Sequence, residues 1–318
     1  MDMLDRLSLA GIVPVIKIED AADAVPLCRA LAEGGLPVAE ITFRTAAAPD
    51  AIAAVHRELP DVLLGAGTVL TAEQVDKAKA AGAGYVVTPG INPQVVARCQ
   101  QVGLPVVPGC ANPSDIEVAI GFGLKVVKFF PAEAIGGLPL IKALAGPYGD
   151  MRFVPTGGIG EKNLLDYLSF PKVAACGGSW MVPDAAIKAK DWDKIRDLTA
   201  SAVQLMLGFE LAHVGVNSQS EGEAKNTADT FGKLLNWPVK EGNGSLFAGA
   251  GLEIMKAQGR GSRGHLAIRT NSVARAKAWL QGRSVAFAEE TAGYKDGKLI
   301  FIYLRDEIGG FAVHLAQK

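Results

Sequence analysis

The chain has 318 residues, of which 49% are hydrophobic and 20% charged, and its formal net charge is -1 at pH 7. This is the composition of a globular protein with enough apolar material for a large core. No overall basic field would draw nucleic acid or an anionic membrane to it, so we expect neither as a partner. An anionic small molecule would have to be held by a local site.

The N-terminal residues and the cysteines both indicate a cytoplasmic protein. Asp2 and Asp5 stand where a secretory signal would carry basic residues, and no apolar run reaches the roughly 18 residues of a membrane span. The cysteines show no CxxC spacing, and we interpret them as reduced core thiols. These residues are Cys28, Cys99, Cys110 and Cys176.

Short β-rich runs alternate with Ala-rich helical stretches from residue 12 to about residue 206. This alternation predicts βαβ units and a parallel sheet. Eight such units in about 200 residues favour a closed (β/α)₈ TIM barrel, with a doubly wound open sheet as the alternative. The predicted strands are IVPVIK, PVAEITF, VLLGAGT, GYVVT, LPVVP, LKVVKFF, MRFVPT and VAACG.

The pattern changes near Gly208, where a long helix expected over residues 184–207 meets a glycine suited to a helix C-cap. Strands dominate beyond it, and HVGV at 213–216 resembles HLAI at 265–268. Each of these two segments is followed by one predicted helix and about three predicted strands. We therefore expect two domains, residues 1–207 and 208–318, the second a smaller α+β domain of two βαβββ modules.

In a barrel of this kind, chemistry takes place at the C-terminal ends of the strands. Lys128 lies there, inside the apolar segment VVKFFP. Burial favours the neutral amine, which is the form that a Schiff-base nucleophile requires. A lysine that only closes the strand or pairs with a carboxylate is the alternative.

Glu40 lies inside the apolar segment VAEITFRT. A carboxylate there is costly unless it is paired or functional. A partly desolvated carboxylate would move protons during carbon–carbon bond cleavage. The alternative is a buried ion pair with Arg44 or Lys128.

Two glycine pairs follow the last two predicted strands, in PTGGI at 155–159 and CGGSW at 176–180. Backbone N–H groups at helix starts after these strands bind phosphate in many barrels, and Ser179 would add a hydroxyl. Tight turns between strand and helix are the other interpretation.

The motifs VAEITFRT, GAGTVL, TPG, KFFPAEAIGG, FVPTGGI and GGSW occur in this order. Together they make residues 8–206 resemble the family of 2-keto-3-deoxy-6-phosphogluconate (KDPG) and 4-hydroxy-2-oxoglutarate (KHG) aldolases. The resemblance implies that Lys128 is the Schiff-base lysine and Glu40 the general acid/base. It implies a pyruvyl pocket of Arg44, Thr68, Pro89, Phe130 and Thr156, and phosphate contacts at Gly157, Gly158, Gly178 and Ser179.

The family resemblance also implies the reaction. KDPG is cleaved reversibly to pyruvate and glyceraldehyde 3-phosphate, a step of the Entner-Doudoroff pathway, and KHG to pyruvate and glyoxylate. The barrel would need no cofactor, because the protonated imine serves as the electron sink. A homotrimer is implied. The segment PGCANPSD departs from the family pattern at Cys110 and Asn112, which leaves the aldehyde specificity open.

The second part of the chain resembles the vicinal oxygen chelate fold of glyoxalase I and extradiol dioxygenases. That resemblance implies one metal ligand on each of four strands, at His213, Glu253, His265 and His314. A glutamate is usual at the last position. In each strand the neighbours of these residues are apolar, so the imidazole or carboxylate faces the opposite side. Such a ligand set suits Zn²⁺, Ni²⁺, Fe²⁺ or Mn²⁺.

Three interpretations of the whole chain remain open at this point. The first is an aldolase that carries an added chelate-fold domain. The second is a bifunctional fusion whose C-terminal domain is a metal-dependent lyase or dioxygenase. The third is a ligand-binding regulatory protein, or a C-terminal module that only sets assembly.

Overall fold

The computed structural model describes residues 2–318, and the chain forms two compact units that divide between Met206 and Leu207. The division lies one residue from the expected boundary. Each unit has its own sheets and its own buried residues, so each is considered by itself. No helix among residues 2–318 combines the length and the apolar character needed to cross a bilayer.

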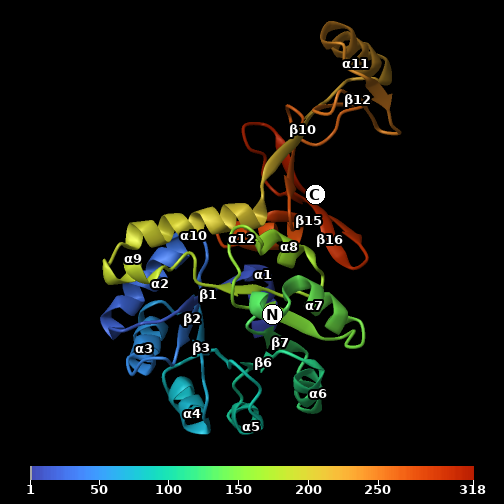
Figure 1. The fold of residues 1–318 in the computed structure, drawn as a ribbon. Helices are drawn as coiled ribbons and strands as arrows, with labels where there is room; N and C mark the ends of the chain where they lie inside the picture. The colour runs from blue at the N-terminus through green and yellow to red at the C-terminus, as the bar shows by residue number, and fades with distance from the viewer. Residues whose placement is uncertain (1) are drawn as a thin grey trace. The chain divides into compact units, whose positions relative to one another are not determined.

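The first unit is built around short parallel strands that lie inside a layer of helices (Figure 1). They form one six-stranded sheet in the order β5-β4-β3-β2-β1-β9 and one three-stranded sheet in the order β6-β7-β8. The strands are β1 (Ile12–Ile16), β2 (Val38–Thr42), β3 (Leu63–Gly67), β4 (Tyr85–Val87), β5 (Val106–Val107), β6 (Gly109–Cys110), β7 (Val126–Phe129), β8 (Arg152–Pro155) and β9 (Cys176–Gly178).

The strands close into a ring. The first strand pairs with the last, with Ile12 opposite Cys176. Strands β8 and β9 are joined by the bridges Phe153–Val173 and Thr156–Gly177. This closure confirms the (β/α)₈ barrel and excludes the open doubly wound sheet.

The fifth predicted strand, LPVVP, is broken in two. Pro108 separates β5 from β6, and because proline has no N–H it cannot continue the ladder as a donor. Its carbonyl still accepts a hydrogen bond of 2.8 Å from the backbone N–H of Lys128. The break therefore falls beside the residue on which the predicted chemistry depends.

The helices of the first unit follow the strands in sequence, and several begin at side-chain caps. Thr71 accepts a hydrogen bond from the N–H of Gln74, and Asn112 accepts one from the N–H of Asp115. The helices are α1 (Met3–Ala10), α2 (Ala24–Glu33), α3 (Ala48–Glu58), α4 (Ala72–Ala80), α5 (Pro93–Gln101), α6 (Pro113–Gly121), α7 (Gly137–Ala145), α8 (Leu164–Ser169), α9 (Asp184–Lys188) and α10 (Trp192–Leu207), with short 3₁₀ turns η1 (Ala21–Asp23) and η2 (Glu133–Ile135).

One helix prediction is wrong. The single long helix expected over residues 184–207 is two helices, α9 and α10. Lys190, between them, has a φ of 56°, a left-handed conformation that no α-helix contains. Gly208, after α10, also has a positive φ of 56°, as expected for a glycine that ends a helix.

The second unit contains one eight-stranded sheet in the order β11-β12-β13-β10-β14-β17-β16-β15. Its chain order gives two βαβββ modules, joined side by side where β10 pairs with β14 in antiparallel fashion. The elements are β10 (Glu210–Val216), α11 (Glu221–Leu235), β11 (Val239–Glu241), β12 (Ser245–Ala248), β13 (Leu252–Met255), β14 (His265–Thr270), α12 (Val273–Gln281), β15 (Phe287–Lys295), β16 (Lys298–Leu304) and β17 (Ala312–Gln317).

Each helix of the second unit covers the strands of its own module. In the first module, α11 contacts β12 and β13 (Figure 1). There Ala224 and Ala228 of α11 pack against Leu246, Ala248 and Ile254 in a buried cluster. In the second module, α12 contacts β16 and β17. The helix-covered face holds the hydrophobic core.

Candidate active site

Lys128 and Glu40 meet inside the barrel. Lys128 lies on β7 and Glu40 on β2, and their Nζ and Oε1 atoms are 3.5 Å apart. The side chains are only 6% and 4% exposed, so the pair is held out of bulk water. The Lys128 amine also lies 5.1 Å from the centre of the Phe130 ring.

One carboxylate oxygen of Glu40, Oε1, is left without a hydrogen-bond donor within residues 2–318. A buried carboxylate oxygen without a donor is costly to maintain and is found where function requires it. The structure thus places Glu40 beside Lys128, as the pairing alternative expected, and the same contact is compatible with proton transfer between the two groups.

Two glycines of β3 make room for this arrangement. A Cβ at Gly67 would lie 2.7 Å from Cγ and 2.9 Å from Cδ of Glu40. Two residues earlier on the same face, a Cβ at Gly65 would collide with the ring of Tyr85. Sequence reasoning missed both glycines, although a Gly-Ala-Gly run in a buried strand is a signal of close approach.

A cavity of about 450 Å³ opens beyond the C-terminal ends of the strands. Phe130 connects it to the buried pair, because its ring lies near the Lys128 amine and also lines the cavity. Seven predicted substrate contacts line this one cavity. They are Arg44, Phe130, Thr156, Gly157, Gly158, Gly178 and Ser179.

The two other predicted contacts lie outside the cavity lining. Thr68 adopts a positive φ of 55°, and its hydroxyl accepts a hydrogen bond of 3.4 Å from Nε of Arg44. The backbone carbonyl of Pro89 approaches Gly109 so closely that a side chain at Gly109 would not fit. Thr68 thus positions Arg44, and Pro89 supports β6.

The sequence suggested that the two glycine pairs stand at helix starts, and this prediction is wrong. Helix α8 begins at Leu164 and α9 at Asp184, whereas Gly157 and Gly158 lie on the turn after β8, and Gly177 and Gly178 end β9. Gly157 and Gly158 have φ values of 101° and 79°, which glycine tolerates. The carbonyl of Gly157 accepts a hydrogen bond of 3.1 Å from the N–H of Glu133, which ties this turn to the one after β7.

The two departures from the family pattern have structural roles. Cys110 is buried on β6, and burial raises the pKa of its thiol to about 12. Asn112 is the N-cap of α6. Neither lines the 450 Å³ cavity, whereas Lys17 and Asp184, which sequence reasoning missed, do.

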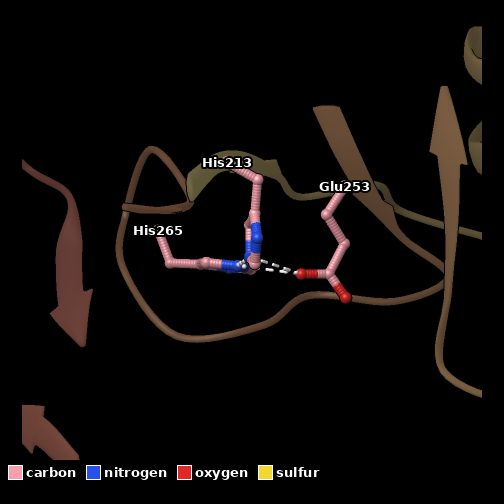
Figure 2. Close-up of side chains that lie close together, drawn as sticks. All are labelled: His213, Glu253 and His265. Atoms are coloured by element: carbon pink, nitrogen blue, oxygen red, sulfur yellow. Dashed lines mark hydrogen bonds and ion pairs between the residues drawn. The ribbon is translucent and has the colours of Figure 1, made fainter. Parts of the chain in front are cut away.

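The second unit contains a separate cluster of possible metal ligands, shown in Figure 2. The Nε2 atom of His213 lies 2.9 Å from Oε2 of Glu253 and 3.1 Å from Nε2 of His265. The His265 and Glu253 atoms are 3.1 Å apart. Three ligand atoms from β10, β13 and β14 therefore converge on one point.

The electrostatics of this cluster favour a carboxylate anion. Hydrogen bonds from His213 and His265 hold the pKa of Glu253 well below its usual range. Ser245 donates a further hydrogen bond of 2.6 Å to the other carboxylate oxygen. Hydrogen bonds of this kind, made to the ligating side chain, orient metal ligands in proteins.

His314, the fourth predicted ligand, is not part of the converging group. Its ring centre lies 5.3 Å from that of His265 and 4.7 Å from that of Phe301. Burial lowers the pKa of its imidazole to about 4. Its Nδ1 atom is buried and has no hydrogen-bond partner within residues 2–318.

A buried amine beside a buried carboxyl group at the strand ends of a barrel is the constellation of imine-forming lyases. Residues 3–198 match the family model described as KDPG and KHG aldolase. The chain belongs to this family. The matched region is the barrel.

Individual members of this family are similar to the barrel region. The 2-dehydro-3-deoxy-phosphogluconate aldolase of Treponema pallidum is 52% identical over 204 residues, which are 64% of this chain and 97% of the relative. The KHG/KDPG aldolase of Escherichia coli K12 is 41% identical over 62% of this chain and 93% of its own. The crystal structure of the Legionella pneumophila KDPG aldolase, with pyruvate captured as a covalent carbinolamine, matches with a TM-score of 0.61 and 41% identity over 62% of this chain and 97% of that one.

Proposed function

We propose that the barrel is a class I aldolase that cleaves KDPG to pyruvate and glyceraldehyde 3-phosphate, and KHG to pyruvate and glyoxylate. The observation that carries the proposal is the buried contact of 3.5 Å between Lys128 and Glu40. The relative at 52% identity is named for KDPG, and the relative at 41% identity is named for both KHG and KDPG. The alignments cover 97% and 93% of these relatives. The regulatory interpretation is disfavoured, because the pair that chemistry needs is intact.

The proposed reaction begins at the ketone. The neutral Lys128 amine adds to the C2 carbonyl, and Glu40 takes a proton from nitrogen and returns it to the oxygen. A proton from solvent, delivered through Glu40, converts the carbinolamine hydroxyl into water, which leaves, and the protonated imine remains. Glu40, 3.5 Å from the amine, is within reach of these proton transfers.

Carbon–carbon cleavage follows from the charge on this imine. The Glu40 carboxylate removes the proton of the C4 hydroxyl, and the C3–C4 bond breaks as its electron pair moves into the imine. The aldehyde leaves, and an enamine of pyruvate remains on Lys128. Protonation of the enamine at C3 by Glu40 and hydrolysis of the imine release pyruvate. Atoms and charges balance over these reaction steps without a cofactor.

The cavity divides into two ends in this proposal. Arg44 and Thr156 hold the substrate carboxylate, with the Phe130 ring against the pyruvyl group. The turns after β8 and β9 hold the phosphate through Ser179 and the glycine N–H groups. These contacts explain how a phosphorylated keto acid would be oriented with C2 toward Lys128.

Trapping with borohydride tests the proposal. The wild-type chain incubated with pyruvate and borohydride should gain a covalent adduct on Lys128, because the reagent reduces the imine. Lys128→Met should show neither adduct nor cleavage, whereas Lys125→Met, an exposed lysine before the same strand, should show both. Cleavage that persists in Lys128→Met would contradict the mechanism.

We further propose that the second unit is a glyoxalase-like, vicinal oxygen chelate domain that binds one divalent metal. The observation that favours it is the convergence of His213, Glu253 and His265. The donor set, two imidazoles and one carboxylate, suits Zn²⁺, Ni²⁺, Fe²⁺ or Mn²⁺. A bound metal would act as a Lewis acid toward a carbonyl or enol oxygen, as a lyase or dioxygenase requires.

Metal analysis of the full chain tests this second proposal. The protein purified without chelators should contain about one divalent ion per chain, and His265→Ala should contain far less. His56→Ala, an exposed histidine of the barrel, is the matched control. Metal-free wild-type protein that also takes up none of the four ions in a titration would refute the site.

We also propose a cytoplasmic homotrimer. The family resemblance supports the trimer, and the burial of all four cysteines is compatible with a reducing compartment. Light scattering should give three times the chain mass of 33.2 kDa. A mass of one or two chains would contradict the trimer.

A further inference from the structure

We infer that Lys17, just after β1, binds the substrate phosphate and makes the barrel prefer phosphorylated over unphosphorylated keto acids. The inference rests on the proposed aldolase function and assigns a specificity-determining residue to its site. No motif of the sequence pointed to this lysine.

Sheet register places Lys17 at the phosphate end of the site. Strands β1 and β9 are parallel neighbours, with Pro14 opposite Gly178. Because both strands run toward the same end of the barrel, the residues after Pro14 lie beside those after Gly178. Lys17 and Ser179 accordingly line the same cavity, together with Gly157.

Lys17 is also the cation that this end of the cavity needs. Among residues 2–318, Lys17 and Arg44 are the positively charged residues in the cavity lining. Arg44 is engaged with Thr68 on the pyruvyl side. A phosphate monoester carries about -1.5 to -2 charges at neutral pH, more than the hydroxyl of Ser179 and the glycine N–H groups neutralise.

Two carboxylates lie near Lys17. Asp184 lines the same cavity, and Glu19 lies 2.5 Å from the Lys17 amine. Asp184 is the carboxylate that a phosphate at Ser179 would meet in this cavity, and the Lys17 amine supplies the opposite charge. Glu19 raises the pKa of Lys17 more than partial desolvation lowers it, Asp184 adds a smaller increase and Arg44 a smaller decrease, so the amine stays charged at neutral pH.

The pair with Glu19 does not prevent this role. Its side chains are 43% and 62% exposed, and ion pairs in such positions contribute little to stability. The amine can therefore move from Glu19 to an incoming phosphate at small cost. A lysine stem has the rotatable bonds that such a movement requires.

The experiment compares cleavage of KDPG, which has a phosphate, with cleavage of KHG, which has none. In Lys17→Met the KM for KDPG should rise about tenfold, which corresponds to about 1.4 kcal/mol of binding, with kcat unchanged. Both constants for KHG should stay as in the wild type. Lys190→Met is the matched control, because Lys190 is an exposed lysine paired with Asp23 at 2.8 Å and lies outside the cavity.

Inorganic phosphate gives a second measurement that does not depend on the aldehyde. It should inhibit KHG cleavage by the wild type, and its inhibition constant should rise in Lys17→Met by a similar factor. An unchanged KM for KDPG, or equal increases for both substrates, would overturn the inference while leaving the aldolase function standing. A wild-type chain that cleaves neither substrate would overturn the proposed function itself, and the inference with it.

Discussion

Replacement of Gly67 by alanine probes the position of Glu40 without changing either catalytic side chain. Gly67 lies in the extended strand β3, so its backbone would accept an alanine. The added methyl group would stand 2.7 Å from Cγ of Glu40, closer than any unstrained contact. Because Glu40 is 3% exposed, the contact with the new methyl group is relieved only if the carboxyl group shifts by about 1 Å.

The expected effect follows from that shift. A misplacement of about 1 Å in a catalytic group costs roughly a hundredfold in rate. Overpacking of a buried site costs about 1–3 kcal/mol of stability. We therefore expect Gly67→Ala to fold with a lowered unfolding midpoint and to release pyruvate from KDPG about a hundredfold more slowly.

Two measurements distinguish this from general damage. Borohydride should still trap pyruvate on Lys128 after long incubation, because the amine itself is untouched, but more slowly, because Glu40 assists imine formation. Gly121→Ala makes the same chemical change at the end of α6, where an added Cβ meets nothing within 4 Å, and should behave like the wild type. A Gly67→Ala enzyme with kcat within twofold of the wild type would refute the reasoning.

Three further predictions concern other parts of the chain. Tyr167→Phe removes the hydroxyl that donates a hydrogen bond to the Glu133 carboxylate, and should lower the barrel's thermal midpoint by about 3–6 °C; an unchanged midpoint would contradict this. The native protein should react slowly with a thiol reagent at pH 8, because all four cysteines are buried and burial raises the pKa of Cys28 and Cys110 to about 12; rapid reaction before unfolding would argue against it. Dialysis against EDTA should leave KDPG cleavage unchanged, and a loss that added metal restores would count against an imine mechanism.

The barrel could be predicted because its strands are short, apolar and evenly spaced, and because each is followed by a helical stretch. The positions of Lys128 and Glu40 followed from the same pattern, since a charged residue in a buried strand is conspicuous. The break at Pro108 was not predicted, although a proline inside a predicted strand indicates a break because it has no N–H to donate. The turn at Lys190 carried no signal, because a lysine rarely adopts a positive φ.

Residues whose role depends on tertiary neighbours were harder to find. Lys17 looks like an ordinary exposed lysine until the pairing of β1 with β9 places it beside Ser179. Gly67 matters only because the Glu40 side chain lies against it. In the second unit, strand alternation placed His314 on the same side as the other ligands, and its ring centre lies 5.3 Å from that of His265, but its ring nitrogens do not join the converging ligand atoms.

The pairing of β1 with β9 has a consequence for the newly synthesised chain. The edge of β1 that faces β9 finds its partner only after residue 176 has left the ribosome. Until then an apolar strand with unpaired N–H and C=O groups is exposed, a state that favours association with other chains. We therefore expect truncated nascent chains ending before Cys176 to depend on chaperones far more than the finished protein.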